Sequence, residues 1–153
     1  MRYGIPRKAV PAYVVFQRAL PQQWRWWHLI TGREWAHCWM MRAEAVGEPG
    51  LLGEWITIKV ETTPARVHID VYGGHPDNLV AEAQVAMRTI DVLALTIDIG
   101  GREEYCPRGP MSCVSLVKAM LGVWWPTVIT PRQLHRKLVS LGAASARVQW
   151  QTR

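Results

Sequence analysis

Two runs of alternating side chains restrict the folds that this chain can adopt more than any other feature. They are EWITIKVE at residues 54–61 and ARVHIDVY at residues 65–72. In each run an aliphatic residue occupies every second position, which is the pattern of a β-strand because successive side chains point to opposite faces. Only TTP lies between the runs, and parallel strands need a much longer crossover. We therefore predict an antiparallel pair in which Val67, Ile69 and Val71 share one face.

Further segments have the composition of strands or the spacing of helices. Strands are predicted at residues 11–20 (PAYVVFQRAL), Ala36–Arg42 and residues 90–100 (IDVLALTIDIG), and helices at Asp77–Arg88, Cys113–Leu121 and residues 131–141 after the N-cap Thr130. The Trp-rich residues 21–35 are predicted to form an aromatic connection or a short helix. Because the strands gather early and centrally and the helices late, we predict an α+β fold rather than a wound parallel sheet.

Length and cysteine usage predict one domain spanning residues 1–153 in a reducing compartment. A chain of 153 residues can bury a substantial core without covalent staples. Cys38, Cys106 and Cys113 form an odd set without paired spacing, which argues against a disulfide framework. No apolar run reaches the ~20 residues that span a bilayer, and the first residues lack the apolar stretch of a secretory signal, so neither a membrane span nor a signal peptide is expected.

The net charge of +6 favours acidic partners, including nucleic acid and cell-wall polymers. Basic residues are nevertheless spread from Arg2 to Arg153 without a basic block, so solvated faces account for most of the charge. The nine tryptophans include two adjacent pairs, Trp26–Trp27 and Trp124–Trp125. Adjacent residues in a strand cannot share a face, so these pairs are predicted to line a core or groove rather than to stack bases. A nucleic-acid partner is therefore not expected.

Cys113 occupies a position where a thiol can become reactive. It begins a predicted helix, directly after the good N-cap residue Ser112, and Gly122 is placed to end that helix. The helix dipole and the free N–H groups at such a terminus lower the pKa of a thiol and turn it into a nucleophile. The alternative is a packing role, since free cysteine is among the most buried residue types.

A cysteine nucleophile needs an imidazole that holds it as thiolate and a third group that orients the imidazole. His37 is the first choice, because Trp35 and Trp39 would share its strand face and shield an ion pair from water. Cys38 must point to the other face and is predicted to be a core thiol. Surface roles are expected for the remaining histidines, His28, His68, His75 and His135.

A metal site built from Cys38, Cys106, Cys113 and His37 would lack the close paired spacing that structural zinc prefers. The sequence has neither a CxxC nor an HxxxH motif. No metal and no other cofactor is therefore predicted.

The segments EWAHCWMM and EWITIKVE, followed far downstream by CVSLVKAMLGVWWPTVITPRQLHRKL, resemble the circularly permuted papain-like cysteine peptidases and amidases, in particular the small members that bacteriophages encode. Ordinary papain-like enzymes have the Cys helix first and the His strand later, whereas the order here is His, strand, Cys. The resemblance covers about residues 12–138 and rests on the His segment and on the Cys helix with its trailing TPxxL. It implies an antiparallel sheet with the Cys helix packed on it.

The same resemblance implies that Cys113 is the nucleophile and His37 its base. The family places a polar residue on the strand after the His, and Glu61 is the only carboxylate on the relevant face of residues 54–61. Glu61 is therefore the candidate third residue, with Glu54 as the alternative.

Stabilisation of an oxyanion needs two donors. The Cys113 backbone N–H is the expected first donor, because it lies at a helix N-terminus. The sequence leaves the second donor open, and Gln17 and Tyr13 in the first strand are the candidates.

The implied function is a thiol hydrolase that cleaves an amide bond in a peptide or a peptidoglycan stem through an acyl-enzyme. The alternative is a catalytically silent structural or accessory protein of a phage virion, because a fold does not fix a function. The expected partners are the substrate and, for the alternative, other virion proteins. The expected location is the host cytoplasm or the virion.

Overall fold

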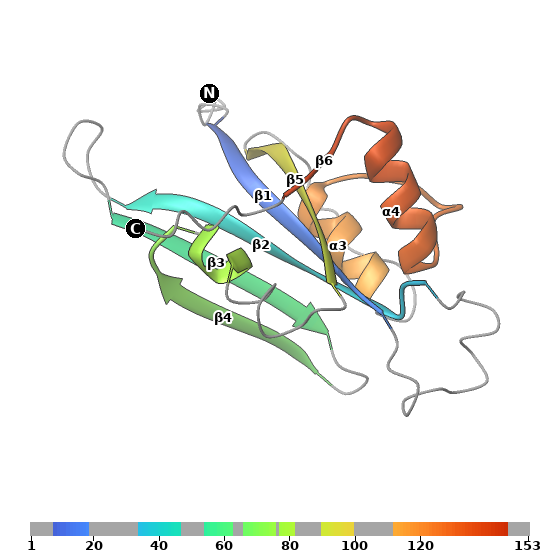
Figure 1. The fold of residues 1–153 in the computed structure, drawn as a ribbon, viewed down its shortest axis with the longest axis horizontal. Helices are drawn as coiled ribbons and strands as arrows, with labels where there is room; N and C mark the ends of the chain where they lie inside the picture. Colours follow the sequence, from blue (N-terminus) through green and yellow to red (C-terminus); the bar gives the residue numbers. More distant parts are fainter. Residues whose placement is uncertain are drawn as a thin grey trace, which may run out of the picture.

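The computed structural model of the protein describes residues 8–18, 34–46, 54–62, 66–75, 77–81, 90–99 and 112–146. They form a six-stranded antiparallel sheet in the order β4-β3-β2-β1-β5-β6, with two helices late in the chain (Figure 1). The strands are β1 (Lys8–Gln17), β2 (His37–Val46), β3 (Glu54–Thr62), β4 (Val67–Gly73), β5 (Ile90–Ile99) and β6 (Ala144–Ser145), and the helices are α3 (Cys113–Leu121) and α4 (Pro131–Ser140). The predicted α+β class and the antiparallel pairing of β3 with β4 are confirmed.

β1 pairs with both β2 and β5 and carries the core on both of its faces. Val14 and Phe16 belong to one buried cluster, and Tyr13 and Val15 belong to a second one. A strand that is covered on both sides needs apolar residues at consecutive positions rather than at every second one. The strand begins and ends earlier than predicted, and its pairing with β2 begins just after Pro11, which has no N–H to give to a ladder.

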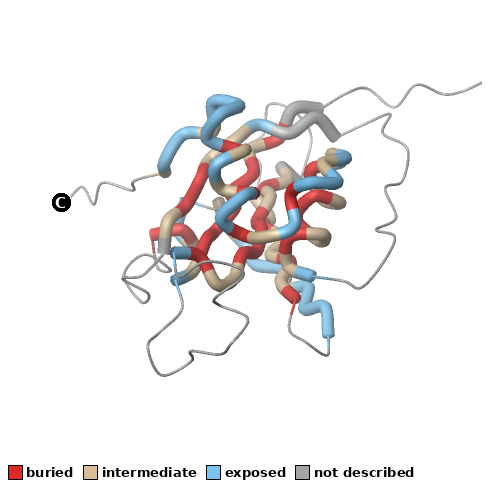
Figure 2. The backbone as a smooth tube through the Cα atoms, turned by 90° about the vertical axis from the view of Figure 1, so that its right-hand side faces the viewer, coloured by how far each residue is buried: buried red, intermediate tan, exposed pale blue. Residues whose placement is uncertain are grey.

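The two helices cover one face of the sheet, and their buried residues close the larger cluster. The residues that form this contact are Val114, Val117 and Leu121 of α3, Leu134 and Leu138 of α4, and Phe16, Cys38, Met40 and Leu93 of the sheet. Figure 2 shows the buried residues gathered in the interior of the molecule. The helix that bears Cys113 is therefore packed on the antiparallel sheet.

Side-chain caps set the ends of α3. The Ser112 side chain accepts a hydrogen bond from the Ser115 N–H, and the Ser115 hydroxyl oxygen accepts one from the Ser112 N–H. Gly122 ends the helix in the left-handed conformation, with φ 62° and ψ 38°, which glycine adopts without steric cost. Thr130 caps α4 in the same way, and Pro131 occupies its first turn. Both predicted helices are confirmed.

His135 joins α4 to the sheet and does not have the predicted surface role. Its Nε2 lies 2.7 Å from Asp91 Oδ2 of β5, and its ring stacks on Trp35 and meets Phe16 edge-on. Trp35 lies just before β2, where strand alternation does not apply, and its buried ring packs in the helix-covered cluster. The prediction that Trp35 shares the face of His37 and Trp39 is therefore wrong.

β4 exposes the side chains that were predicted to share a face. Ile69 and Val71 are each 64% exposed, and Val67 is exposed as well. The alternation correctly places them on one face, but β4 is the edge strand and the larger buried cluster contains no residue of it. Alternation alone fixes which residues share a face and not whether that face is covered.

The predicted helix at Asp77–Arg88 is described only over residues 77–81, which are helical; its remainder lies outside the described residues, as do residues 21–33 with His28. Across the described ranges, no helix has both the length and the apolar character required to cross a membrane.

We expect the contact of α4 with the sheet to contribute strongly to stability. Leu134 is fully buried, whereas Val139 on the same helix is 48% exposed. Leu134→Ala should lower the free energy of unfolding by about 2–5 kcal/mol because it leaves a cavity, and Val139→Ala should change it by less than about 1 kcal/mol. Urea unfolding followed by tryptophan fluorescence measures both, and equal effects would contradict the packing of α4 described above.

Candidate active site

The candidate site forms where two elements begin. Cys113 is the first residue of α3, and His37 and Cys38 are the first residues of β2. α3 packs against β2, and Cys113 contacts the buried cluster to which Cys38 belongs. The Cys113 sulfur is thereby placed beside two consecutive residues, His37 and Cys38, that are far from it in the sequence.

The Cys113 sulfur interacts with both residues of the His37–Cys38 pair. The pKa of its thiol responds to the His37 side chain, to the Cys38 side chain and to the Cys38 backbone, so all three lie close to the sulfur. Because consecutive strand side chains point to opposite faces, a sulfur that meets both must lie beside the backbone at the start of the strand. The structure thus brings together the Cys113 and His37 predicted from the sequence.

Glu61 lies on the other side of His37. Its Oε1 is 3.2 Å from His37 Nε2, and its Oε2 is 2.7 Å from Lys59 Nζ. With Nε2 engaged by the carboxylate, Nδ1 is the ring nitrogen that remains for the thiol. Lys59, Glu61, His37 and Cys113 therefore form a continuous series of charged or chargeable groups.

The thiol and the imidazole shift each other toward an ion pair. A hydrogen bond from Cys38 is the largest influence on Cys113, and together with His37 it outweighs burial and lowers the pKa of Cys113 to about 4. Burial alone would lower the pKa of His37, but hydrogen bonds and charge from Cys113 and Glu61 raise it to about 9. Between these values the site holds a thiolate and an imidazolium.

Cys38, which neighbours the thiolate, and Glu61, which neighbours the imidazolium, have opposite protonation states. The hydrogen bond to Cys113, followed by burial, raises the pKa of Cys38 well above its usual value, so Cys38 keeps its proton and donates it. The hydrogen bond from His37 is the main reason that the pKa of Glu61 falls to about 2, and Lys59 adds to this effect against burial. Cys38 is thus a neutral donor to the thiolate, and Glu61 is an anion beside the imidazolium.

The sequence predicts Cys38 only as a core thiol and indicates no role for Lys59. Cys38 is indeed fully buried, but it also lies close enough to Cys113 to lower the pKa of that thiol. Alternation gave no signal for this contact, because it places neighbouring residues on opposite faces. Lys59 lies two residues before Glu61 on the same strand face, and that spacing is a signal that could have identified it; its Nζ also lies 4.8 Å from the centre of the Trp39 ring.

The register of the sheet distinguishes Glu61 from Glu54. Glu54 pairs with Val46, the last residue of β2, whereas His37 is the first. The backbone of Glu54 therefore lies at the opposite end of the hairpin from His37, whereas the Glu61 carboxylate lies beside the imidazole.

The two candidates for a second oxyanion donor have different surroundings. Tyr13 donates its hydroxyl proton to Asp77 Oδ1 at 2.5 Å and packs in the cluster that does not include α3, so it is not available at Cys113. Gln17 pairs directly with His37 across β1 and β2 and is partly exposed. Gln17 is therefore the candidate that lies at the site.

Cys106 lies outside the described residues. Among the residues that the structure does describe, no group of three or more His, Cys, Asp or Glu side chains is placed to hold a metal ion.

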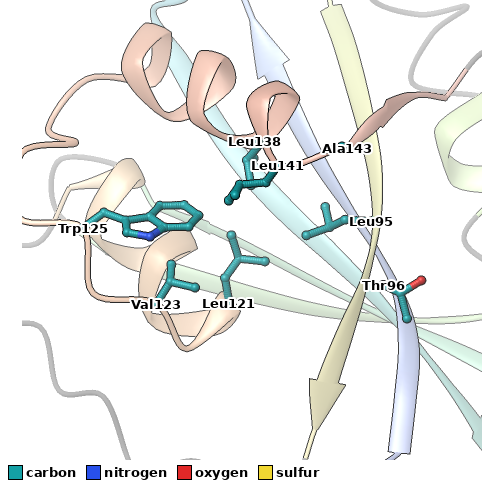
Figure 3. A pocket seen from close by; sticks show the side chains of 9 residues that line it. Leu95, Thr96, Leu121, Val123, Trp125, Leu138, Leu141 and Ala143 are labelled. Carbon is teal, nitrogen blue, oxygen red and sulfur yellow. The ribbon is translucent and has the colours of Figure 1, made fainter.

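A cavity of 290 Å³ lies between α3, α4 and β5 (Figure 3). None of the residues that line it belongs to the candidate site. Leu121, Trp125, Leu138 and Leu95 are among the residues that line it. Leu121 is the last residue of α3, about 12 Å along the helix from Cys113 at a rise of 1.5 Å per residue. The cavity is a gap in the apolar contact between the two helices and the sheet.

The chain matches no protein-family model, no curated protein and no solved structure. The geometry of Cys113, His37 and Glu61 is therefore the basis for assigning a function.

We expect Cys113 to be alkylated by iodoacetamide at a rate that stays constant from about pH 5 to about pH 8. The thiolate forms above the Cys113 pKa of about 4, and the imidazolium beside it persists below the His37 pKa of about 9. Buried, protonated Cys38 should label far more slowly. Peptide mapping by mass spectrometry distinguishes the two cysteines.

His37→Ala removes the charged partner, so the pKa of Cys113 should rise toward the ~8.5 of an ordinary thiol, and its labelling should become slower at neutral pH and increase with pH. His68→Ala, which changes an exposed histidine of β4, is the matched control and should label like the wild type. A wild-type rate that already rises tenfold per pH unit through neutrality would show that no ion pair exists.

Proposed function

We propose that this protein is a thiol hydrolase that cleaves an amide bond in a peptide or a peptidoglycan stem through an acyl-enzyme. The observation that carries the proposal is the placement of Cys113 at the start of α3 beside His37, whose far ring nitrogen is held by Glu61. A nucleophile, a base and an orienting carboxylate in this relation are the parts that acyl transfer needs.

The first step is attack of the Cys113 thiolate on the amide carbonyl carbon. The Cys113 N–H belongs to the first turn of α3, where backbone donors have no acceptor within the helix. Such a donor stabilises the oxygen anion of the tetrahedral intermediate, and the helix N-terminus adds a favourable field. Gln17, opposite His37, is the residue best placed to supply a second donor.

His37 then transfers protons in both halves of the reaction. As an imidazolium it gives a proton to the departing amine, so that the C–N bond breaks and a thioester forms on Cys113. The neutral imidazole that remains takes a proton from water, which attacks the thioester and releases the acid. Glu61 holds the ring in place through Nε2 and favours the imidazolium, and Lys59 keeps Glu61 ionised.

The order of these groups along the chain supports a permuted papain-like fold. His37 starts β2, Glu61 lies near the end of the adjacent β3, and Cys113 follows on a helix that packs against β2. The permuted papain-like enzymes that the sequence resembles, including those encoded by bacteriophages, have the same order. The resemblance implies a peptide or a peptidoglycan stem as the amide substrate.

A second candidate function is a structural protein of a virion that keeps the same fold with a silent site. The exposed aliphatic residues Ile69 and Val71 on the edge strand β4 favour it, because apolar side chains beside unpaired backbone groups are suited to protein contacts.

Substitutions at the site separate the two candidates. Cys113→Ala should abolish cleavage of casein and of peptidoglycan stem peptides. Glu61→Gln should keep the fold and lower turnover by about 10²- to 10⁴-fold, because an amide neither fixes the ring tautomer nor stabilises the imidazolium as a carboxylate does.

Glu44→Gln is the matched control, since Glu44 pairs with Arg42 farther along β2 and should leave turnover unchanged. Release of new amino groups measures cleavage, and thermal melts verify folding. If the wild type is as inactive as Cys113→Ala on every substrate, the hydrolase proposal fails and the structural candidate remains.

A further inference from the structure

Cys38 provides a second thiol at the candidate site that the proposed hydrolysis does not consume. Its side chain is fully buried in the helix-covered cluster, and Cys113 packs against the same cluster. Both cysteines are free, they begin two elements that pack against each other, and each is close enough to the other to shift the pKa of its thiol. Two thiols placed in this way can become a disulfide, with a sulfur–sulfur distance of about 2.05 Å, through a small movement of the side chains.

The two sulfurs differ in exposure and in protonation state, and both differences direct an oxidant to Cys113 first. Cys113 is partly exposed at the start of α3 and carries the negative charge, and the thiolate is the form that reacts with peroxides. Cys38 has no exposed surface and keeps its proton, so an oxidant reaches it only through Cys113.

We propose that a hydroperoxide converts these two cysteines into a reversible Cys38–Cys113 disulfide. The disulfide removes the nucleophile, and this regulatory consequence rests on the proposed hydrolase function. The disulfide itself requires only the two cysteines and the oxidant.

The chemistry proceeds in two balanced steps. The Cys113 thiolate attacks the terminal oxygen of the hydroperoxide, the O–O bond breaks, and the departing alkoxide or hydroxide takes a proton from the His37 imidazolium. Cys113 is then a sulfenic acid. The Cys38 sulfur attacks the Cys113 sulfur, the S–S bond forms as the S–O bond breaks, and the hydroxide leaves as water with the Cys38 proton. Two thiols are oxidised by two electrons, and the hydroperoxide is reduced.

Without Cys38 the same oxidation would be destructive. A sulfenic acid that finds no thiol is oxidised further to sulfinic acid, which ordinary thiol reductants do not reverse. Cys38 therefore protects the nucleophile by trapping it in a form that a dithiol can reduce.

The test uses the full-length reduced protein, hydrogen peroxide as the probe, and peptide mapping without reduction after the remaining thiols are blocked. The wild type should yield a Cys38–Cys113 linked peptide pair, and dithiothreitol should restore nearly all of the Cys113 labelling by iodoacetamide. Cys38→Ser keeps a hydrogen-bond donor but cannot form the bond, so its Cys113 should become sulfinic acid and stay unlabelled after dithiothreitol. Cys106→Ser is the control and should form the linked pair like the wild type.

Two results would overturn the inference: a wild type in which Cys113 passes to sulfinic acid without the linked pair, or a disulfide that joins Cys113 to Cys106 instead. The mapping does not depend on turnover. A linked pair in a protein that cleaves no amide would refute the hydrolase and keep the disulfide, whereas an active hydrolase without the pair would do the reverse.

Discussion

α3 lies against β2 because its buried side chains, among them Val114 and Val117, close the same core that contains Cys38 and Met40. That contact sets the position of the first residue of the helix, and the caps at Ser112 and Gly122 set where the helix begins and ends. A helix that began one residue later would turn the Cys113 side chain by about 100° around its axis. The relation of the sulfur to His37 thus depends on ordinary apolar packing and on two capping residues.

Neighbouring groups stabilise the charges at the site. Burial opposes the charged forms of Cys113, His37 and Glu61, and it is outweighed by Cys38 and His37 at Cys113, by Cys113 and Glu61 at His37, and by His37 and Lys59 at Glu61. The members therefore depend on each other, and removing one leaves a partly buried charge without its partner. Substitutions within the series are expected to be non-additive, unlike substitutions at separate positions in the core.

The parts of this structure that local chemistry determines could be predicted from the sequence. Ser112 and Gly122 define the Cys helix, alternation defines β3 and β4, and residue type and position alone make Cys113, His37 and Glu61 the candidates. What the sequence could not provide depends on tertiary placement. Register separates Glu61 from Glu54, and only the packing of α3 on β2 shows that Cys38 reaches Cys113. His135 looked like a surface residue because its partner Asp91 is distant in the sequence.

The series Lys59, Glu61, His37 and Cys113 alternates in sign, and its charges sum to zero while the pH lies between the pKa of about 4 for Cys113 and that of about 9 for His37. A neutral row of charges produces a field that falls off quickly with distance, so it neither attracts nor repels a charged substrate from afar. Long-range steering is left to the rest of the surface of a protein with a net charge of +6. Added salt should therefore slow the encounter with an acidic substrate while leaving the thiolate itself unchanged.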